Sequence, residues 1–476
     1  MGRKEKERQV FEEFNNEVNE LLKTAKKFKK EKNRAVKRQI REHSKLERMR
    51  VKRDRGNIAN WFTLDNAGII YPSIREENWD FVFRVSALMK SPIDKEILQK
   101  TIDDIQPRFP SFFISLKSGF FWNYFEENRR QLIVEEEKDF PCSKFTRKGS
   151  EHLIRVLYYK NRISLECFHA IADGRSALKL LNAIVKHYIE LCGVKFSNDT
   201  TTFNYLDKPR REELADSFGE YCNKLKKIKH KEVDAYKIKG TEEEFGVVNS
   251  TIGVMSVSQV KEVAKRHDAK LFEFILASLA EGVINRAKHE GKTKKPVKIS
   301  IPVDLRQFFE SESLRNFSGY LNIELPVKDY NFNELIEVIR AELKKITKDY
   351  MQGFINSNAS MRKNYFIKIV PLFIKNFVIR MCFKAWGETY QTLAVSNIGV
   401  NCVPEEFCKY VERFEFNLGR PKYNAKSIGL IAYGDKLVCT FSSKIKENAT
   451  EKDFFTGLAR RGVELTIETN RRDLYE

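Results

Sequence analysis

The pattern of hydrophobic and polar positions changes its period within residues 163–192, ISLECFHAIADGRSALKLLNAIVKHYIELC. Ile163, Leu165 and Cys167 alternate with mostly polar neighbours, which is the period of a half-buried β-strand. After Gly174 the apolar residues recur at helical spacing, and lysines occupy the opposite face, which predicts a long amphipathic helix. The sequence therefore predicts a strand, a short loop and a helix, with a histidine and an aspartate in the loop.

The same two periods predict further elements along the chain. Strands are expected at 81–87, 297–303 and 463–468, and helices at 95–105, 271–288 and 332–347. Strand 153–159 should pair with 163–168 across a tight turn, and 427–433 should pair with 436–442 around Gly434-Asp435. The chain thus mixes helices and hairpin-linked strands, which indicates an α/β (α+β) fold.

The loop His169-Ala-Ile-Ala-Asp173-Gly174 carries the strongest candidate chemistry. A neutral imidazole at pH 7 can accept the proton of a hydroxyl or thiol during attack on a carbonyl. Asp173 lies too near His169 in sequence to be an independent second base, so we expect it to turn back and fix the loop, paired with a cation. Gly174 is expected to supply backbone angles that a side chain would forbid. The alternative is a satisfied core histidine beside an ordinary turn.

A second strand end offers a weaker candidate. Residues 393–395 predict a short strand, and Ser396 and Asn397 follow it in a predicted strand-end loop. Either side chain could donate a hydrogen bond to an oxyanion that develops during acyl transfer. The alternative interpretation is a simple turn, in which such residues are common.

Composition bounds the domain organisation. At 476 residues the chain is long enough for two lobes. We expect a basic helical extension at 1–56, a first lobe at 57–195, a crossover linker at 196–239 and a second lobe at 240–476. The eight cysteines have no metal-ligand spacing, and the first ten residues are charged rather than apolar, which predicts free thiols, a cytoplasmic protein and no metal site. No apolar run is long enough to span a membrane.

Two segments stand apart from the globular pattern. Residues 1–56 hold 20 Lys or Arg and 10 Asp or Glu, and so carry half of the net charge of +20. This segment is expected to be a helix that docks on the body or on a second copy, or that contacts an anionic membrane surface or an acidic carrier protein. A nucleic-acid partner is not expected, because no recognition motif accompanies the basic run. Residues 365–386 are apolar with scattered basic residues, which suits a core helix, an in-plane membrane helix or a lipid tunnel wall.

The motif HAIADG resembles the HxxxDG motif of the chloramphenicol acetyltransferase-like acyltransferase superfamily. Three further stretches, at 61–73 (WFTLDNAGIIYPS), 302–306 (PVDLR) and 416–421 (FNLGRP), resemble its bacterial alcohol acetyltransferase-like branch. Condensation domains of peptide synthetases usually carry two adjacent histidines, and here Phe168 fills the first position. The DFGWG motif of plant-type members is absent.

This resemblance implies two lobes of mixed sheets flanked by helices, with the active site between them. It implies His169 and Asp173 as the catalytic residues, with His169 as the general base, and Arg306 as the cation that pairs with Asp173 across the lobes. The alternative for Arg306 is a local pair with Asp304 or Glu310. No permanently bound cofactor is implied; acyl-CoA would be the co-substrate and a small-molecule alcohol the acceptor.

Two other functions stay open at this point. A carrier-protein-dependent acyltransferase or condensation-type enzyme would use the same histidine with an acyl carrier protein as donor. A non-catalytic binding protein would instead use the basic N-terminal helix.

Overall fold

The computed structural model describes residues 61–65, 68–76, 79–145, 151–196, 199–223, 232–291, 294–363 and 369–471, without the side chains of 359–363 and 386. The chain divides into two compact units, Met1–Asn60 and Trp61–Glu476, and every described residue belongs to the second. The predicted basic helix at 1–56 lies outside the described residues. The predicted lobe boundaries stay predictions.

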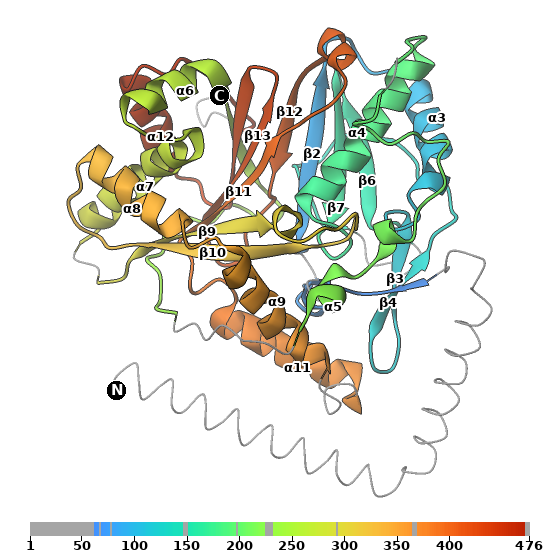
Figure 1. The fold of residues 1–476 in the computed structure, drawn as a ribbon, viewed down its shortest axis with the longest axis horizontal. Coiled ribbons are helices and arrows are strands. Elements are labelled where there is room, and N and C mark those ends of the chain that lie inside the picture. Colours follow the sequence, from blue (N-terminus) through green and yellow to red (C-terminus); the bar gives the residue numbers. More distant parts are fainter. Residues whose placement is uncertain are drawn as a thin grey trace, which may run out of the picture. The chain divides into compact units, whose positions relative to one another are not determined.

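The first lobe is built on a five-stranded sheet covered by two helices (Figure 1). The sheet order is β12-β2-β7-β6-β5. Its strands are β12 (Val411–Asn417), β2 (Val82–Met89), β7 (Arg162–Phe168), β6 (Ile154–Tyr159) and β5 (Glu135–Glu136), and its helices are α3 (Lys95–Ile105) and α4 (Gly174–Leu191). The β6–β7 pairing is antiparallel, as predicted.

The second lobe is a seven-stranded mixed sheet with the order β10-β9-β11-β13-β14-β8-β15. These strands are β10 (Ser318–Leu325), β9 (Val297–Asp304), β11 (Leu393–Val400), β13 (Lys426–Tyr433), β14 (Lys436–Ser443), β8 (Asn249–Ser256) and β15 (Leu465–Thr469). The helices α6 (Val257–Arg266), α7 (Leu271–His289), α8 (Phe332–Leu343) and α12 (Ala449–Arg460) accompany it. The β13–β14 hairpin matches the pairing expected from the sequence.

The remaining elements are short and surround the two lobes. A small sheet has the order β1-β4-β3, with β1 (Trp61–Thr63), β4 (Asn123–Glu127) and β3 (Ile114–Ser118). The longer remaining helices are α9 (Lys348–Lys363) and α11 (Leu372–Cys382), and the short turns are α2 (Ile70–Ser73), η1 (Gln106–Arg108), η2 (Glu212–Leu214), α5 (Ser217–Tyr221), η3 (Leu305–Gln307), η4 (Phe383–Gly387) and η5 (Glu405–Lys409).

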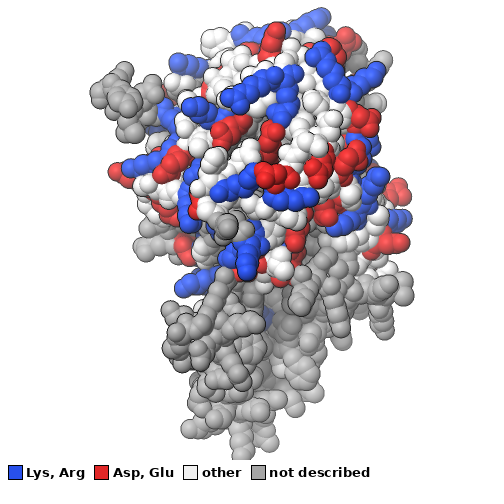
Figure 2. All heavy atoms as spheres, turned by 90° about the vertical axis from the view of Figure 1, so that its left-hand side faces the viewer, with Lys and Arg blue, Asp and Glu red and all other residues white. Residues whose placement is uncertain are grey.

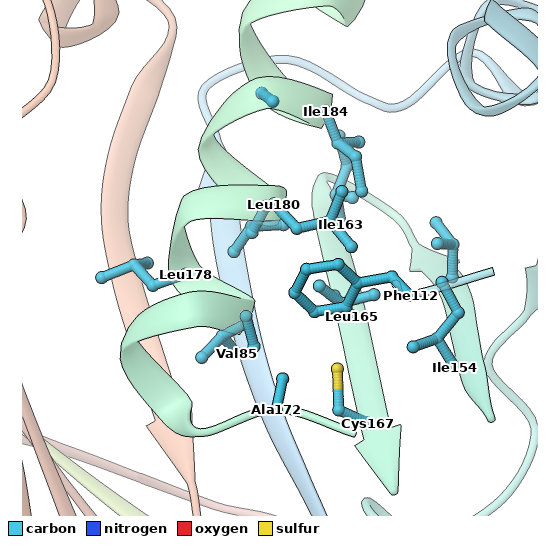
Figure 3. Packing of buried hydrophobic residues seen from close by; sticks show 14 of the residues in the cluster. Val85, Phe112, Ile154, Ile163, Leu165, Cys167, Ala172, Leu178, Leu180 and Ile184 are labelled. Atoms are coloured by element: carbon cyan, nitrogen blue, oxygen red, sulfur yellow. The ribbon is translucent and has the colours of Figure 1, made fainter. Parts of the chain in front are cut away.

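Strand β7 and helix α4 form the centre of the first-lobe core. Figure 3 shows Ile163 and Leu165 of β7 facing Leu180 and Ile184 of α4, and all four side chains are buried. Burial of each such side chain contributes about 1.5–3 kcal/mol. The loop between β7 and α4 is thus held at both ends by tightly packed elements.

The other face of β7 is buried too, which corrects the prediction of a half-buried strand. Ser164 and Glu166 are excluded from solvent, and Glu166 lies 2.6 Å from Arg84 of β2 and 2.5 Å from Arg155 of β6. This polar face is turned toward the second-lobe sheet, because a small cavity beside it is lined by Arg84, Ser86, Pro141, Arg162, Ser250, Ile252, Glu415, Asn417 and Thr440. The polar residues of β7 therefore lie on a face that is buried between the two sheets, and this face is not exposed to solvent.

Strand β12 joins the two lobes. It lies late in the chain but pairs with β2 at the edge of the first-lobe sheet. Its neighbour in sequence, β13, lies in the second-lobe sheet, and a Cβ added at Gly429 of β13 would lie only 2.1 Å from the backbone oxygen of Phe416 in β12. The two sheets thus approach each other backbone to backbone where the chain crosses between them.

We predict that Gly429→Ala destabilises the protein by about 1–3 kcal/mol, because the added methyl group must push the two backbones apart. The measurement is the free energy of unfolding from urea titration. Gly457→Ala in α12 is the matched control, since the nearest atom there is the flexible end of Arg461. That control should be neutral or stabilising by up to about 1 kcal/mol. Equal stability of Gly429→Ala and wild type would contradict this account of the lobe junction.

Candidate active site

His169 lies directly after β7, where the strand delivers it to the end of the first-lobe sheet. Its backbone N–H donates to the carbonyl oxygen of Phe81 (2.8 Å), which continues the β2–β7 pairing by one residue. The ring stacks on Tyr71 with centroids 4.7 Å apart and meets the edge of Phe83 at 5.0 Å. His169 is half-buried, and its ring is packed between these two aromatic side chains.

Asn316 fixes the tautomer of this histidine. Its side-chain amide nitrogen donates to the backbone oxygens of His169 (3.1 Å) and Ala170 (3.3 Å). Because these partners can only accept, the other atom of the Asn316 amide is the oxygen, and it faces Nδ1 of His169 at 3.2 Å. Nδ1 therefore carries the proton, and Nε2 keeps its lone pair.

The surroundings also favour the neutral ring. Burial lowers the pKa of His169 from its ordinary value, although a hydrogen bond to its own backbone, the Asp173 carboxylate and Asn316 act in the opposite direction. An imidazole that is neutral at pH 7, with Nε2 unprotonated, is the form that can accept a proton.

Asp173 has the structural role expected from the sequence. Its Oδ1 accepts from the backbone N–H of Ser176 (2.9 Å) and so caps α4. Its Oδ2 accepts from Arg306 (2.8 Å) and from the backbone N–H of Phe317 (3.0 Å). Burial would raise the pKa of this carboxyl, but the Arg306 guanidinium and the N–H donors hold it below its usual range. Asp173 thus stays a carboxylate that faces away from proton transfer.

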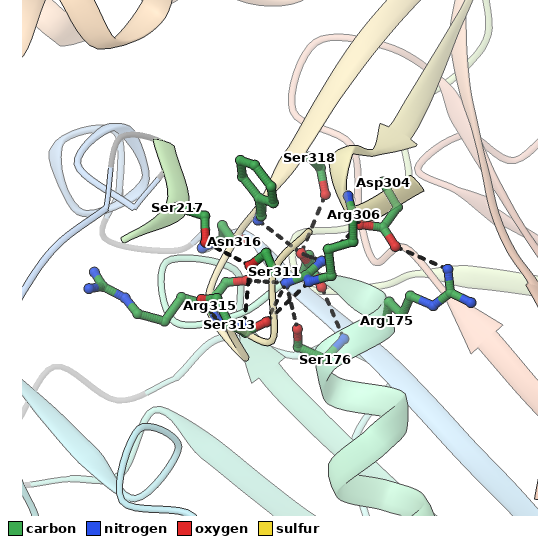
Figure 4. A network of polar contacts seen from close by, with 12 residues as sticks. Arg175, Ser176, Ser217, Asp304, Arg306, Ser311, Ser313, Arg315, Asn316 and Ser318 are labelled. Atoms are coloured by element: carbon green, nitrogen blue, oxygen red, sulfur yellow. Dashed lines mark hydrogen bonds and ion pairs between the residues drawn. The ribbon is translucent and has the colours of Figure 1, made fainter. Parts of the chain in front are cut away.

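The contact between Arg306 and Asp173 is confirmed, and the local alternative is present as well. Nη1 of Arg306 lies 2.8 Å from Asp173 and 2.9 Å from Asp304. Its other nitrogens donate to the backbone oxygens of Ser313 and Arg315 and to the Ser176 hydroxyl. Figure 4 shows this guanidinium at the centre of the network formed by the 304–318 loop of the second lobe and the start of α4. The pair therefore ties the two lobes together beside His169.

Gly174 is required for a different reason than expected. It begins α4 and does not have a positive φ, so the prediction of special backbone angles is wrong. A Cβ at this position would lie 3.0 Å from the ring of Phe416 and 3.4 Å from Ile398. The glycine therefore makes room for the first residue of the FNLGRP stretch, which lies at the end of β12.

Ser396 and Asn397 do not lie in a strand-end loop. Strand β11 continues to Val400 across a bulge, because its parallel pairing with β13 persists on both sides of that irregularity. The Asn397 oxygen accepts from the backbone N–H of Gly399 (2.9 Å). Among the described residues no hydrogen bond joins Ser396 or Asn397 to His169, and their role as oxyanion donors stays a prediction.

Several residues of the site were not assigned a role from the sequence. Asn316 and Tyr71 touch the histidine, and Asp65, which is fully buried, lies 3.7 Å from Arg315 and accepts from Gly68 (2.6 Å). Asp65, Gly68 and Tyr71 belong to the 61–73 stretch, so that stretch is the signal that could have identified them. In the described part of the chain no three His, Cys, Asp or Glu side chains are arranged to hold a metal ion.

Comparisons with known structures agree with this geometry. The chain superposes on polyketide synthase associated protein 5 from Mycobacterium tuberculosis with a TM-score of 0.53 at 13% identity, covering 84% of this chain and 97% of that one. It superposes on the condensation domain of the Monacolin K polyketide synthase MokA with a TM-score of 0.53 at 11% identity, covering 85% and 96%. For TRI3 trichothecene 15-O-acetyltransferase from Fusarium sporotrichioides the values are 0.51, 10%, 84% and 94%.

The fold of the protein is therefore the two-lobed fold shared by condensation domains and chloramphenicol acetyltransferase-like acyltransferases, as the sequence predicted. No family model matches the chain, and no curated protein matches it in sequence.

We predict that Arg306→Met destabilises the protein by about 3–5 kcal/mol at pH 7, because the buried Asp173 carboxylate loses its cation. In the wild type the lowered pKa keeps Asp173 charged and paired as the pH falls toward the ordinary value near 4. In the variant burial raises that pKa, so protonation relieves the penalty. The difference in unfolding free energy should therefore shrink between pH 7 and about 4.5.

Urea titrations of both proteins at the two pH values test this expectation. Arg266→Met is the matched control, because Arg266 pairs with Glu262 on the surface, where both side chains are largely exposed. Its loss should cost less than about 1 kcal/mol at either pH. A deficit in Arg306→Met that does not change with pH would show that Asp173 is not the stranded group.

Proposed function

We propose that this protein is an acyltransferase that moves an acyl group from acyl-CoA to an alcohol, with His169 as the general base. The observation that carries the proposal is the contact between Nδ1 of His169 and the side-chain oxygen of Asn316, from which we infer that Nδ1 holds the proton and Nε2 keeps its lone pair. The half-buried ring lies beside the contact between the lobes. The fold shared with a trichothecene acetyltransferase and with condensation domains supports acyl transfer as the reaction class.

The reaction needs one base and no covalent intermediate. Nε2 of His169 takes the proton of the acceptor hydroxyl while the hydroxyl oxygen attacks the thioester carbonyl. The tetrahedral oxyanion then collapses, the carbon–sulfur bond breaks, and the leaving thiolate takes the proton from His169. Asp173 and Arg306 act as positioning residues, because they form an ion pair with each other and hydrogen bonds with backbone groups. Ser396 is our candidate donor to the oxyanion, and Asn397 is its alternative.

The alcohol acetyltransferase-like branch is part of this proposal. The 61–73 stretch supports it, because Asp65 and Tyr71 of that stretch lie at the site. The single histidine of the motif, preceded by a fully buried Phe168, favours a stand-alone acyltransferase over a peptide-bond former.

A carrier-protein donor is the second candidate. It is favoured by the fold shared with a polyketide synthase associated protein and with a condensation domain of a polyketide synthase. Both donors present the same thioester to the histidine, so they differ only in what binds outside the site. A non-catalytic binding protein remains the third candidate and is excluded if His169 proves necessary for turnover.

We predict that His169→Ala lowers acyl transfer at least about a hundredfold, because the attacking hydroxyl loses its proton acceptor. The measurement is thiol release from acyl-CoA of several chain lengths in the presence of pooled alcohols, with the ester product identified by mass spectrometry. His289→Ala, which removes an exposed imidazole at the end of α7, is the matched control and should keep wild-type turnover.

The same assay with the acyl group on a carrier protein separates the donors. Turnover with acyl-CoA supports the first proposal, and turnover with the carrier alone supports the second. Unchanged thiol release in His169→Ala would remove the catalytic proposal altogether.

The pH dependence of kcat/KM provides an independent test. Because burial lowers the pKa of His169, the base is already neutral at and above its ordinary pKa of about 6.5. We therefore expect kcat/KM to be constant from neutral pH upward and to fall as one group protonates below about pH 6.5. An inflection above pH 7 would mean that another group limits the reaction or that the ring carries a charge in the free enzyme.

A further inference from the structure

Helix α11 buries a lysine and exposes two phenylalanines. Its sequence is LFIKNFVIRMC, and its only buried residue is Lys375. A surface helix normally turns its apolar residues to the core and its charges to water. In α11 Phe373 and Phe377 are exposed instead, and the other apolar residues are partly buried.

The buried lysine explains how the outer face becomes free of charge. Nζ of Lys375 donates to the backbone oxygen of Phe121 (3.0 Å) and lies 3.3 Å from the ring centroid of Trp122. Its residue exposure is 8%, and burial lowers its pKa to about 8. The charge in the middle of the helix is thus turned toward the β3–β4 hairpin and away from solvent.

The exposed side chains form one surface, which we call the α11 face: Ile369, Phe373, Phe377 and Phe120. Phe373 is 69% exposed and Phe377 is 43% exposed, one helical turn apart. Phe120 is 68% exposed at the tip of the β3–β4 hairpin, and its backbone oxygen accepts from the N–H of Leu372 (2.9 Å). Figure 1 shows the hairpin tip and α11 on the same side of the second unit.

The chain segment that contains α11 carries charge of a single sign. Between Asp349 and Glu388 the sequence has six Lys or Arg residues and no Asp or Glu. Arg380 and Lys384 of this stretch are exposed beside the apolar side chains. On the face in Figure 2, by contrast, acidic and basic side chains are intermixed. An exposed apolar strip flanked by exposed Arg and Lys side chains is typical of helices that lie on anionic membranes.

The α11 face also leads toward the candidate active site. Phe383, which follows α11, contacts Phe81 with ring centroids 5.9 Å apart, Phe81 contacts Tyr71 at 5.1 Å, and Tyr71 stacks on His169. A chain of aromatic rings therefore joins the end of the exposed helix to the imidazole.

We propose that the α11 face is a docking surface for an anionic lipid bilayer, on which α11 lies in the plane of the interface. No helix in the described ranges is long and apolar enough to cross a membrane. An acidic protein partner fits less well, because its carboxylates would seek a cation at the centre of the surface, and Lys375 is withdrawn from it. This inference does not depend on the acyl-transfer proposal.

Flotation of the full chain with vesicles tests the proposal. We expect binding to phosphatidylcholine vesicles that contain phosphatidylglycerol, and weaker binding to pure phosphatidylcholine or at high salt. The double variant Phe373→Ser/Phe377→Ser should bind the anionic vesicles at least about tenfold more weakly, because two large apolar side chains no longer insert. Replacing both residues by Trp should retain binding, since Trp favours the interface.

Leu206→Ser is the matched control, because Leu206 is 72% exposed and follows Tyr205, which stacks on His187 of α4 rather than on α11. It should bind like wild type. All variants should unfold at the wild-type temperature, since the changed side chains are exposed. If the double Ser variant binds the anionic vesicles as strongly as the wild type does, any membrane contact belongs to another part of the chain and the proposal is overturned. A dimer that the double Ser variant dissociates, without vesicle binding by wild type, would assign the face to a second copy.

Discussion

The contact between Asp173 and Arg306 is the constraint on which the site depends. One carboxylate caps α4, accepts a backbone N–H from Phe317 and pairs with the guanidinium, so both of its oxygens are used inside the protein. The guanidinium in turn donates to two carboxylates, a hydroxyl and two backbone oxygens. A buried ion pair of this kind adds little net stability but tolerates little displacement, because each unpaired atom would carry the cost of its burial.

That intolerance is what positions the histidine. Arg306 and Asn316 lie in the same loop of the second lobe, and Arg306 holds the loop by its backbone at Ser313 and Arg315. Asn316 follows at once and reaches both the ring and the backbone of His169. The ion pair therefore acts on His169 indirectly. Arg306 holds the second-lobe loop in place, and this loop positions the Asn316 amide. The amide then determines which nitrogen of the imidazole carries the proton. Reactive histidines generally need such hydrogen bonds from groups that do not themselves react, because these bonds hold the ring in one orientation.

Local patterns predicted the elements that these residues connect, and long-range packing decided the rest. The strand, loop and helix around His169 and the β13–β14 hairpin were predictable, since period and turn residues carry local information. The Asp173–Arg306 contact was expected only through the resemblance to a known family. The reason for Gly174 was not predictable, because Phe416 reaches it from a strand more than two hundred residues later. The role of Asn316 was equally hidden, because nothing near it in sequence indicates that its amide would span two lobes. The prediction that β7 is half-buried was wrong for the same reason. An alternating pattern identifies the two faces of a strand, but it does not show what packs against each face.

Two parts of the molecule depart from the rule that apolar groups are buried and charges exposed, and they differ in one respect. In the polar layer at the lobe junction, Glu166 meets two arginines and the backbone N–H of Cys142, so its burial is compensated inside the protein. At α11 the lysine is compensated by Phe121 and Trp122, whereas Phe373 and Phe377 remain 69% and 43% exposed. Exposed aromatic surface of this kind is explained when the rings are buried by something outside the chain. The segment between Asp349 and Glu388 has basic and no acidic residues, which favours an anionic surface as that partner.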